Sequence, residues 1–527
     1  MRRFLTPLAA LIGAPLAVVA SLLWSPWWWF AAVPLIALLL LGAYDLAQRR
    51  HSILRNYPVI GHFRSALEAI RPEMQQYFVE RNTDGRPFDR DARSLVYERA
   101  KGANQEKAFG TELDVYDVGA EFLAHSMTPL VPPTEQHRVT VGGPQCSQPY
   151  SMALLNVSAM SFGALSANAI LALNRGAALG GFAHDTGEGG LSRHHLQHGG
   201  DLVWEIGSGY FGCRSDDGTF DEAAFRDKAQ HPSVRCISVK LSQGAKPGIG
   251  GVMPAAKMSS EIAEARGVPV GVKCVSPPAH STFHTPVGLL EFVARLRAAS
   301  GGKPTGFKLC VGNPVAVASI GKAILASGIL PDFIIVDGSE GGTGAAPLEF
   351  EDHVGLPLTE GLVVVRNVLV GCDVKPHIAI GASGKVSSGV DIVKRLIQGA
   401  DYTNAARAMM MALGCIQAQR CHTNTCPVGV TTQDPKRTRA LVITDKAERV
   451  RRFQHETVRS AQALIAAMGL TGPEQLRSHH LMRRTGTDIV RPFGVIHPQL
   501  LPGQLLADPP PQWDDYWNRA SADTFDG

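Results

Sequence analysis

The sequence predicts an α/β protein, a (β/α)8 barrel of the TIM type preceded by a transmembrane hairpin of two helices. Three observations lead to this prediction. The segment from Phe4 to Tyr44 has no charged side chain. After Pro129, short apolar runs alternate with amphipathic helical patterns, and many runs end in a Gly-, Ser- or Asp-rich loop. With 527 residues, 45% of them hydrophobic and 19% charged, the chain can bury a large core, which excludes a disordered protein.

Residues 1–50 are expected to form the hairpin, because the uncharged run is about twice as long as one helix needs to cross ~30 Å of hydrocarbon. Pro26 cannot continue a helix, so the first span should end at Ser25. Interfacial tryptophans surround this break: Trp24, Trp27, Trp28 and Trp29. Arginines flank the two spans: Arg2, Arg3, Arg49, Arg50 and Arg55. This charge pattern predicts that both ends lie in the cytoplasm, and a cleaved signal peptide is the alternative.

Residues 51–130 and 441–527 carry no chemical motif. We expect an N-terminal helical extension over 51–130, with helices near 53–78 and 95–108, and a C-terminal helical tail over 441–527.

The barrel is expected over residues 131–440. Eight apolar runs are predicted as its strands: 153–157, 181–184, 236–241, 268–275, 306–311, 333–336, 377–380 and 402–405. Helical patterns such as 167–178 and 389–398 separate them, and eight such alternations indicate a closed parallel barrel, with a doubly wound open sheet as the alternative. In such a barrel the chemistry lies on the loops that follow the strands.

Two glycine-rich loops follow the sixth and seventh predicted strands, GGTGAAP at 341–347 and GASGK at 381–385. Glycines let backbone N–H groups approach a phosphate, and a helix predicted near Ser387 would add a favourable dipole. Together with Arg407 these loops predict a site for flavin mononucleotide (FMN). The residues expected to bind the cofactor are Met160, Ser161, Lys308, Gly341, Gly342, Gly344, Gly381, Gly384 and Arg407.

Two lysines, Lys240 and Lys308, end the third and fifth predicted strands and should point into the barrel mouth. A buried lysine needs an anionic partner. A substrate carboxylate or a reduced flavin would serve, and a carboxylate of the barrel is the alternative. Glu188, in the loop TGEGG, is expected to have a chemical role, as a proton relay or a binding group for ammonium. The alternative is a structural role, in which it caps local N–H groups.

Cys415, Cys421 and Cys426 cluster in a loop at 412–433, after the eighth predicted strand. Three thiolates without a fourth nearby cysteine favour an iron-sulfur cluster with three protein ligands. A zinc site completed by His422 and a set of buried structural cysteines are the alternatives.

The motifs resemble the synthase core of glutamate synthase over roughly residues 150–435. They are MSFGALS (160–166), TGEGG (186–190), KLSQGAKPGIGG (240–251), SPP (276–278), GGTGA (341–345) and CHTNTCPVGVTTQ (421–433). The resemblance implies an FMN-binding barrel with a 3Fe-4S cluster on Cys415, Cys421 and Cys426. It also implies that Glu188, Lys240, Lys246 and Ser276 belong to the pocket for 2-oxoglutarate and flavin. The most similar members are stand-alone FMN-binding proteins with a membrane-spanning N-terminus.

The sequence departs from the large members of that family in the substrate loops. Ile249 and Val252 replace a carboxylate and an amide, and Glu205 and Tyr210 replace Gln and Arg. Because Ile249 leaves Lys240 without an acidic neighbour in its own loop, we expect the partner of Lys240 to be the ligand.

The resemblance implies an oxidoreductase acting on CH–NH2 donors, which makes L-glutamate from 2-oxoglutarate and ammonia. The catalytic residues would be Glu188, Lys240 and Lys308, and the substrate-binding residues Lys240, Lys246 and Ser276. Imine reduction with an alkylamine, as in N-methylglutamate synthesis, and a membrane-attached electron-transfer module are the alternatives.

The expected partners are an external electron donor (ferredoxin or a reductase subunit), a separate glutaminase, and the membrane. The expected location is the cytoplasmic membrane with the catalytic domain facing the cytoplasm. A net charge of +4 without a basic block does not indicate binding to nucleic acid.

Overall fold

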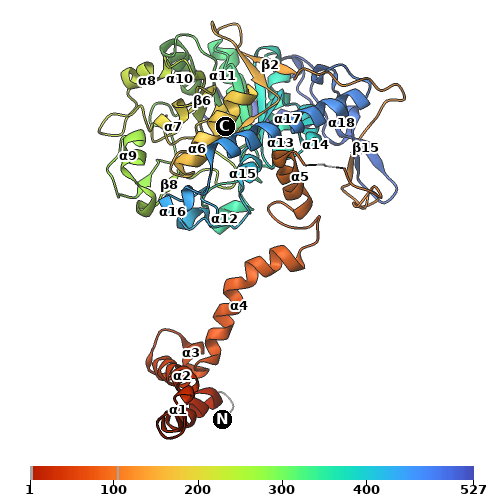
Figure 1. The fold of residues 1–527 in the computed structure, drawn as a ribbon. Coiled ribbons are helices and arrows are strands. Elements are labelled where there is room, and N and C mark those ends of the chain that lie inside the picture. Colours follow the sequence, from red (N-terminus) through yellow and green to blue (C-terminus); the bar gives the residue numbers. More distant parts are fainter. Residues whose placement is uncertain (1–3, 104–105, 527) are drawn as a thin grey trace. The chain divides into compact units, whose positions relative to one another are not determined.

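The computed structural model describes residues 4–103 and 106–526. The chain divides into two compact units, the first ending at Arg90 and the second running from Asp91 to Gly527. Figure 1 colours them along the sequence, and each unit is described by itself.

The N-terminal unit begins with a helical hairpin, as predicted. Helices α1 (Leu5–Leu23) and α2 (Trp29–Ala47) pack against each other, and the short 3-10 turn η2 (Pro26–Trp28) joins them at the predicted break. Small buried residues line the helices: Ala10, Ala14, Ala17 and Ser21 on α1, and Ala32 and Gly42 on α2. Both spans have the length and apolar composition of membrane-crossing helices. Arg2 and Arg3, used in the topology prediction, lie outside the described residues.

The rest of this unit is helical. Helix α3 (Ser52–Asn56) leads to α4 (Ile60–Met74), which continues into a π-helical turn η3 (Gln75–Val79). Asp45, near the end of α2, is fully buried and accepts hydrogen bonds from the backbone N–H of Val59 (2.8 Å) and from Nε2 of His62 (2.9 Å). The start of α4 is therefore fixed to the end of α2.

The second unit contains a closed eight-stranded parallel barrel, which confirms the predicted fold class. Its strands in order are β4 (Leu155–Val157), β5 (His184–Asp185), β6 (Leu202–Ile206), β7 (Val234–Lys240), β10 (Thr305–Leu309), β11 (Phe333–Asp337), β12 (Ala379–Ser383) and β13 (Tyr402–Ala405). A hairpin of β2 (Arg138–Val141) and β3 (Tyr150–Ala153) contributes Val141, Tyr150 and Met152 to a core cluster shared with barrel residues such as Phe333 and Tyr402.

One predicted barrel strand is wrong and one was missed. Residues 268–275 do not enter the barrel. Their last two residues form β9 (Cys274–Val275), which pairs antiparallel with β8 (Val252–Met253) in an excursion between β7 and β10. The alternating apolar side chains there are exposed, including Val270 (60%) and Val272 (54%). The missed strand is β6, whose buried Glu205 interrupts the apolar pattern. Lys240 and Lys308 consequently lie opposite each other on neighbouring strands β7 and β10.

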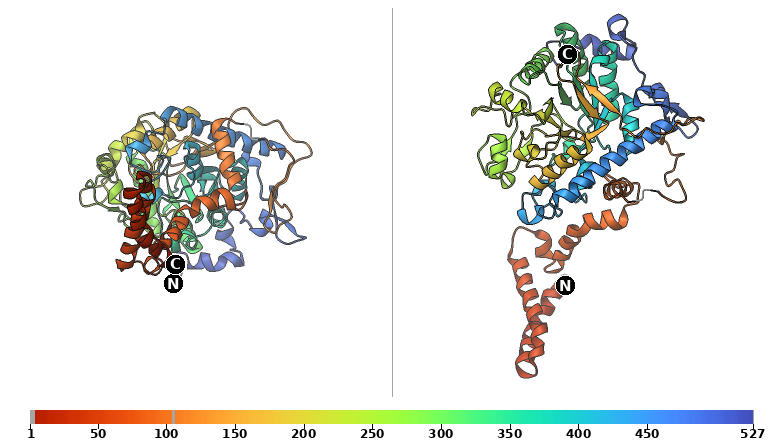
Figure 2. Two further views of the ribbon diagram at one scale, coloured as in Figure 1. Left: turned by 60° about the horizontal axis from the view of Figure 1, so that its bottom comes forward. Right: turned by 45° about the horizontal axis from the view of Figure 1, so that its top comes forward.

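Helices cover the outside of the barrel and sit on its loops (Figure 2). They are α6 (Ala167–Gly180), α7 (Arg193–Leu196), α8 (Glu222–Ala229), η4 (Ala255–Lys257), α9 (Ser260–Arg266), α10 (Pro286–Ala299), α11 (Pro314–Ser327), α12 (Leu348–Glu351), α13 (Leu358–Gly371), η5 (Lys375–His377), α14 (Gly389–Gln398), α15 (Arg407–Leu413), η6 (Cys421–Thr423) and α16 (Pro435–Thr438). Leu, Ile, Val and Phe side chains between the helices and strands β6 to β12 form an extensive buried cluster.

The segments before and after the barrel pack together within the second unit. Helix α5 (Arg90–Lys101) contacts the long helix α17 (Ile443–Ala467), where Arg99 donates to Thr457 (3.1 Å). Strand β1 (Glu121–Leu123) pairs antiparallel with β14 (Leu481–Arg484), and β15 (Val490–Pro492) completes a small sheet. The remaining elements are η7 (Pro473–Gln475), η8 (Ser478–His480), α18 (Phe493–Ile496), α19 (Gln504–Ala507) and α20 (Pro511–Arg519). The segment expected as a helical tail thus also contains two strands.

Candidate active site

The side chain of Lys240 forms a buried ion pair at the carboxyl end of β7. Its Nζ lies 2.7 Å from Oε1 of Glu188, and the two side chains are only 6% and 16% exposed. Burial alone would raise the pKa of Glu188, but Lys240, with smaller contributions from Lys246 and Lys308, lowers that pKa to about 2. The expectation that Lys240 lacks a carboxylate partner in the chain is wrong, because the loop after β5 supplies one that its own loop does not.

The excursion between β7 and β10 brings Lys246 and Ser276 to the same place. A Cβ on Gly251 would lie 2.5 Å from Oε1 of Glu188 and 3.4 Å from Oγ of Ser276, so this glycine is enclosed between the two side chains. Lys246 is buried, and burial together with the charge of Lys240 lowers its pKa. Glu188, Lys240, Lys246 and Ser276, separate in the sequence, are thus gathered around one point.

Lys308 forms a second buried ion pair, with Glu205 on β6. Burial would lower the pKa of Lys308, but Glu205, Asp185 and Asp337 raise it well above its ordinary value. Burial and the neighbouring Glu205 also raise the pKa of Asp185 to about 8, although Lys308 opposes this. Three carboxyl groups therefore surround one ammonium group inside the barrel mouth, a concentration of acidic groups that the sequence motifs did not indicate.

The glycine loops predicted for the flavin lie at the carboxyl ends of β11 and β12. Arg407, the first residue of α15, is packed over Gly342, where a Cβ would meet its Cδ at 2.7 Å. Its Nη2 donates to the carbonyl of Glu340 (2.6 Å). Gly384 has φ +149° and a Cβ there would press on Leu358 at 3.3 Å, which explains why the position needs glycine. On the side of β4, Gly187 packs on the backbone of Met160 and Ser161.

The helix expected to assist a phosphate, α14, begins at Gly389 and has a carboxylate of its own near its N-terminus. Asp391 accepts hydrogen bonds from the backbone N–H groups of Ser387 and Ser388 (2.9 Å each) and caps the N-terminus of α14. The Asp391 carboxylate partly offsets the helix dipole, so the contribution of this helix to phosphate binding stays a prediction. A phosphate at this edge would meet the glycine loops, the half-buried Arg407 guanidinium and the paired hydroxyls of Ser158 and Ser383 (3.1 Å). These residues fit an FMN phosphate.

Two residues of the site were not singled out from the sequence as site residues, His280 and Tyr210. Nε2 of His280 donates to the carbonyl of Lys240 (2.9 Å), and Nδ1 lies 3.2 Å from the hydroxyl of Tyr210. Burial lowers the pKa of His280 to about 4, so the ring is neutral and Nδ1 accepts a hydrogen bond from the Tyr210 hydroxyl. The Tyr210 oxygen also accepts from the N–H groups of Ser281 and Thr282. This network fixes the end of β7 and thereby the backbone of Lys240.

The three clustered cysteines lie in the loop after α15. Burial, reinforced by the nearby thiols of Cys421 and Cys426, raises the pKa of Cys415 to about 12. Burial would also raise the pKa of Cys426, but hydrogen bonds from the Thr431 side chain and from backbone N–H groups of Val428, Val430 and Thr431 lower it. Within the part of the chain that the structure describes, no three His, Cys, Asp or Glu side chains converge closely enough to hold a metal ion. The three thiols are the donor type that an iron-sulfur cluster needs, but their side chains do not converge on one point in this structure.

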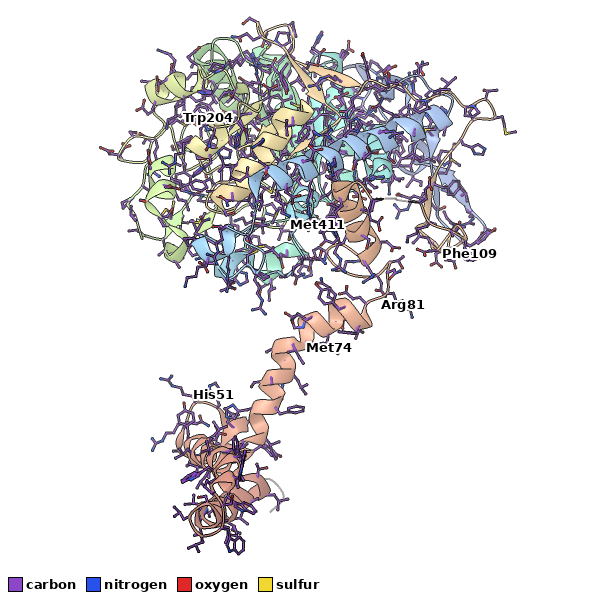
Figure 3. The ribbon with its side chains drawn as sticks, viewed as in Figure 1. His51, Met74, Arg81, Phe109, Trp204 and Met411 are labelled. Carbon is purple, nitrogen blue, oxygen red and sulfur yellow. The ribbon has the colours of Figure 1, made fainter. Side chains whose placement is uncertain are left out.

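The cysteine loop is held from two sides by residues that the sequence did not reveal. The buried Nζ of Lys257 donates to the carbonyls of Cys421 (2.8 Å) and Thr431 (2.7 Å). The hydroxyl of Tyr97, on α5, donates to the carbonyl of Cys415 (2.7 Å). Met411 on α15, labelled in Figure 3, belongs to the buried helix that precedes the loop. Part of the segment at 51–130 therefore supports the cysteine loop.

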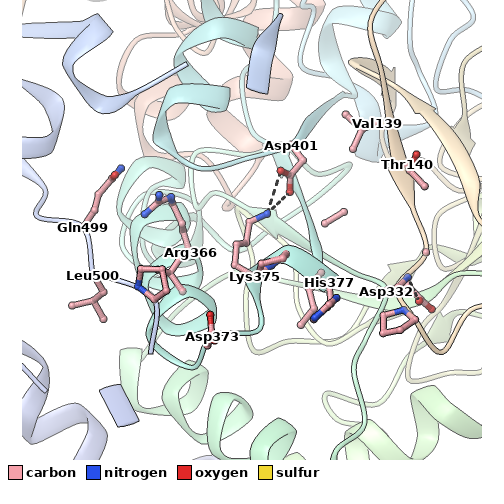
Figure 4. A pocket seen from close by; sticks show the side chains of 18 of the residues that line it. Val139, Thr140, Asp332, Arg366, Asp373, Lys375, His377, Asp401, Gln499 and Leu500 are labelled. Carbon is pink, nitrogen blue, oxygen red and sulfur yellow. Dashed lines mark hydrogen bonds and ion pairs between the residues drawn. The ribbon is translucent and has the colours of Figure 1, made fainter. Parts of the chain in front are cut away.

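A cavity of about 940 Å³ lies at the other end of the barrel (Figure 4). It is lined by residues that precede strands or cover that end, among them Thr140, Asp332, Arg366, Lys375 and Asp401. Lys375 is paired with Asp401 at 2.8 Å there. Since the lysine and glycine loops of the candidate site follow the strands, this cavity is separate from that site.

Comparison with known proteins decides the family. The model for the conserved region in glutamate synthase matches residues 125–471. The chain belongs to the glutamate synthase family. Within this family, it is 35% identical over 508 residues to the glutamate synthase large subunit-like protein YerD of Bacillus subtilis, an alignment that covers 88% of this chain and 96% of that protein.

Two further glutamate synthase relatives match a shorter part of the chain. The archaeal-type glutamate synthase [NADPH] of Thermotoga neapolitana is 32% identical over 323 residues, which is 61% of this chain and 60% of that protein. The archaeal glutamate synthase [NADPH] of Methanocaldococcus jannaschii is 32% identical over 324 residues, again 61% of this chain and 60% of that protein. The chain therefore spans nearly all of the Bacillus relative and less than two thirds of the other two.

Proposed function

We propose that this member of the glutamate synthase family is a membrane-tethered oxidoreductase that converts 2-oxoglutarate and ammonia to L-glutamate. The observation that carries the proposal is the pair of buried ion pairs, Lys240–Glu188 and Lys308–Glu205, at the carboxyl ends of barrel strands or in the loops that follow them. Buried ion pairs are costly to desolvate, and ionisable groups with strongly shifted pKa values at a barrel mouth are typical of functional sites.

Lys240 and Lys246 are the proposed binding groups for the oxo acid. Both ammonium groups are buried beside one carboxylate, Glu188, so this corner of the site retains one net positive charge for a dicarboxylate. The Ser276 hydroxyl, beside Gly251, is available as a further hydrogen-bond donor. Glu188 is ionised at neutral pH and is suited to hold ammonium or accept a proton when the oxo acid and the amine condense with loss of water.

FMN is the proposed cofactor and would supply a hydride to the imine carbon when bound. Gly341, Gly342, Gly344, Gly381, Gly384 and Arg407 would hold its phosphate end, and Met160 and Ser161 would contribute further contacts to the cofactor. Lys308 would offset negative charge on the reduced ring, while Asp185, which retains its proton near neutral pH, is a candidate proton source for the nitrogen.

A 3Fe-4S cluster on Cys415, Cys421 and Cys426 is the proposed entry point for electrons. The hydrogen bonds to Cys426 and the anchoring of the loop by Lys257 support a thiolate ligand set. The donor would be external, a ferredoxin or a reductase subunit, and ammonia would come from solution or from a separate glutaminase. The helices α1 and α2 support attachment to the cytoplasmic membrane, with the barrel on the cytoplasmic side.

The proposal is tested by reducing the flavin anaerobically and following its reoxidation at saturating ammonia. We expect 2-oxoglutarate to reoxidise the flavin and L-glutamate to accumulate in equal amount. A requirement for methylamine in place of ammonia would assign the protein to N-methylglutamate synthesis. If no oxo acid reoxidises the flavin while an artificial electron acceptor does, the protein is an electron-transfer module and the proposal is refuted.

A further inference from the structure

Helix α4 and the π-helical turn η3 carry an exposed apolar stripe. Its members recur at intervals of three and four residues, which places them on one side of the helix. They are Ile60, Phe63, Leu67, Ile70 and Met74 on α4, followed by Tyr77 and Phe78 in η3. Each is between 45% and 77% exposed, although all are large and apolar. Met74 is labelled in Figure 3. A continuous apolar stripe of this kind indicates a binding surface.

We infer that this stripe lies on the surface of a lipid bilayer, parallel to its plane. The inference rests on the proposed membrane attachment of α1 and α2. The contacts of Asp45 with Val59 and His62 fix the first turn of α4 to the end of α2, which is where the apolar span of α2 ends. The stripe therefore starts at the boundary between hydrocarbon and water.

The direction of α4 agrees with this position. Figure 1 views α1 and α2 nearly end-on and α4 from the side, so within this unit α4 runs crosswise to the hairpin. If the hairpin crosses the bilayer along its normal, α4 lies along the membrane surface over its whole length. An amphipathic helix in that orientation buries its apolar side in the headgroup region.

The charges around the stripe also favour lipid. Between residues 49 and 81 the chain has six arginines and three glutamates, a net charge of +3. The arginines are Arg49, Arg50, Arg55, Arg64, Arg71 and Arg81. A cationic segment beside a membrane span is attracted to the anionic lipids of the cytoplasmic leaflet. Phe63, Tyr77 and Phe78 add the aromatic side chains common at membrane interfaces.

A second copy of the chain fits the stripe less well. In a parallel coiled coil the positions flanking the stripe would pair Ala66 with Arg71 and Glu73 with Phe78, and neither is an ion pair. The stripe thus has the spacing of a coiled coil without the charge pattern that selects a partner helix. A lipid surface, which requires no matched partner charges, is the better occupant.

Site-specific photo-crosslinking of the full chain in vesicles of phosphatidylethanolamine and phosphatidylglycerol tests the inference. A p-benzoylphenylalanine side chain replaces Phe63 or Ile70 in the stripe, Ser65 on the opposite side of α4, or Leu40 in α2. Ser65 is exposed and is the matched control. Leu40 is an exposed apolar residue of the hairpin and controls for membrane insertion itself. Mass spectrometry of the irradiated protein identifies the product at each position.

We expect lipid adducts at positions 63 and 70 in yields similar to that at 40 and at least several-fold above that at 65. Lipid adducts at 40 with no excess at 63 and 70 over 65 would overturn the inference while leaving the membrane hairpin intact. A covalent dimer or an intrachain product from 63 and 70 would also overturn it, and would identify a second copy or the chain itself as the occupant. No lipid adduct at 40 would refute the membrane attachment, and with it the position of the stripe.

Discussion

Replacing Lys240 by methionine tests the central assignment of the site, because methionine keeps most of the volume and removes the charge. The magnitude follows from its partner. The pKa of Glu188 lies at about 2 instead of 4.5, a shift that Lys240 dominates against the opposing effect of burial. A shift of this size corresponds to about 3 kcal/mol in favour of the carboxylate at this position. A substrate carboxylate in the same contact should gain a similar amount, and its loss should lower kcat/KM by about two orders of magnitude.

The assay is stopped-flow reoxidation of the reduced flavin by 2-oxoglutarate and ammonia, with the wild type, Lys240→Met, Glu188→Gln and the double variant. Flavin content is measured in each and should remain normal, since Lys240 is assigned to the substrate. Lys240→Met removes the ion-pair partner of the buried Glu188 carboxylate. The uncompensated carboxylate would repel a dicarboxylate even if Lys240 never contacted the substrate. The double variant removes that repulsion and isolates the direct contact between Lys240 and the oxo acid.

We expect the double variant to stay at least tenfold below Glu188→Gln in kcat/KM, because the contact with the oxo acid is missing in one and present in the other. Recovery of the double variant to the level of Glu188→Gln would mean that Lys240 only neutralises Glu188. A parallel loss of flavin would assign Lys240 to the cofactor site. Either result would refute the reasoning.

Four other predictions follow from the same geometry. The purified protein should contain non-covalent FMN, and Gly384→Val should release it, because the new side chain would meet Leu358 and the backbone has φ +149°. Gly312→Ala, at a glycine with open space around it, should retain FMN and is the control. A bound FAD would contradict the assignment. Cys421→Ser should abolish the electron paramagnetic resonance signal of an oxidised 3Fe-4S cluster and leave the flavin, with Cys146→Ser as the control; zinc in place of iron would disprove the cluster. The pKa of Asp185 is raised to about 8, whereas its value in the unfolded chain is about 3.9. Between these two pH values the folded protein holds a proton on Asp185 that the unfolded chain has lost. The stabilisation that this proton gives the fold is therefore complete below about pH 4 and is lost as the pH rises to about 8. The melting temperature should therefore fall less over that range in Asp185→Asn than in the wild type, and identical profiles would contradict the shift. Reporters fused to the C-terminus should be active only if they work in the cytoplasm, and activity of a periplasmic reporter would contradict the topology.

The sequence by itself determined the parts of this protein that depend on local patterns. The uncharged run and Ser25–Pro26 predict two helices and the break between them, because helix length and the missing proline donor act within a few residues. The apolar runs predict seven of the eight barrel strands, since parallel strands buried on both faces have apolar side chains throughout. Once the strands are predicted, the motif-bearing loops are placed at their carboxyl ends. The residue types in these loops indicate phosphate binding and thiolate ligands.

Only the tertiary structure decided which charged groups meet. Glu188 and Lys240, like Glu205 and Lys308, come from different strands or loops, and barrel closure brings them together. Strand β6 was missed because Glu205 interrupts its apolar pattern. The charge of Glu205 is compensated by Lys308, which lies about a hundred residues further along the chain. The hydrogen bonds from Tyr97 to the carbonyl of Cys415 and from Lys257 to the carbonyl of Cys421 likewise join residues that are far apart in the sequence. A pattern along the sequence reports the preference of each segment for burial, whereas the partner of a buried charge is selected by packing between segments, which no local pattern encodes.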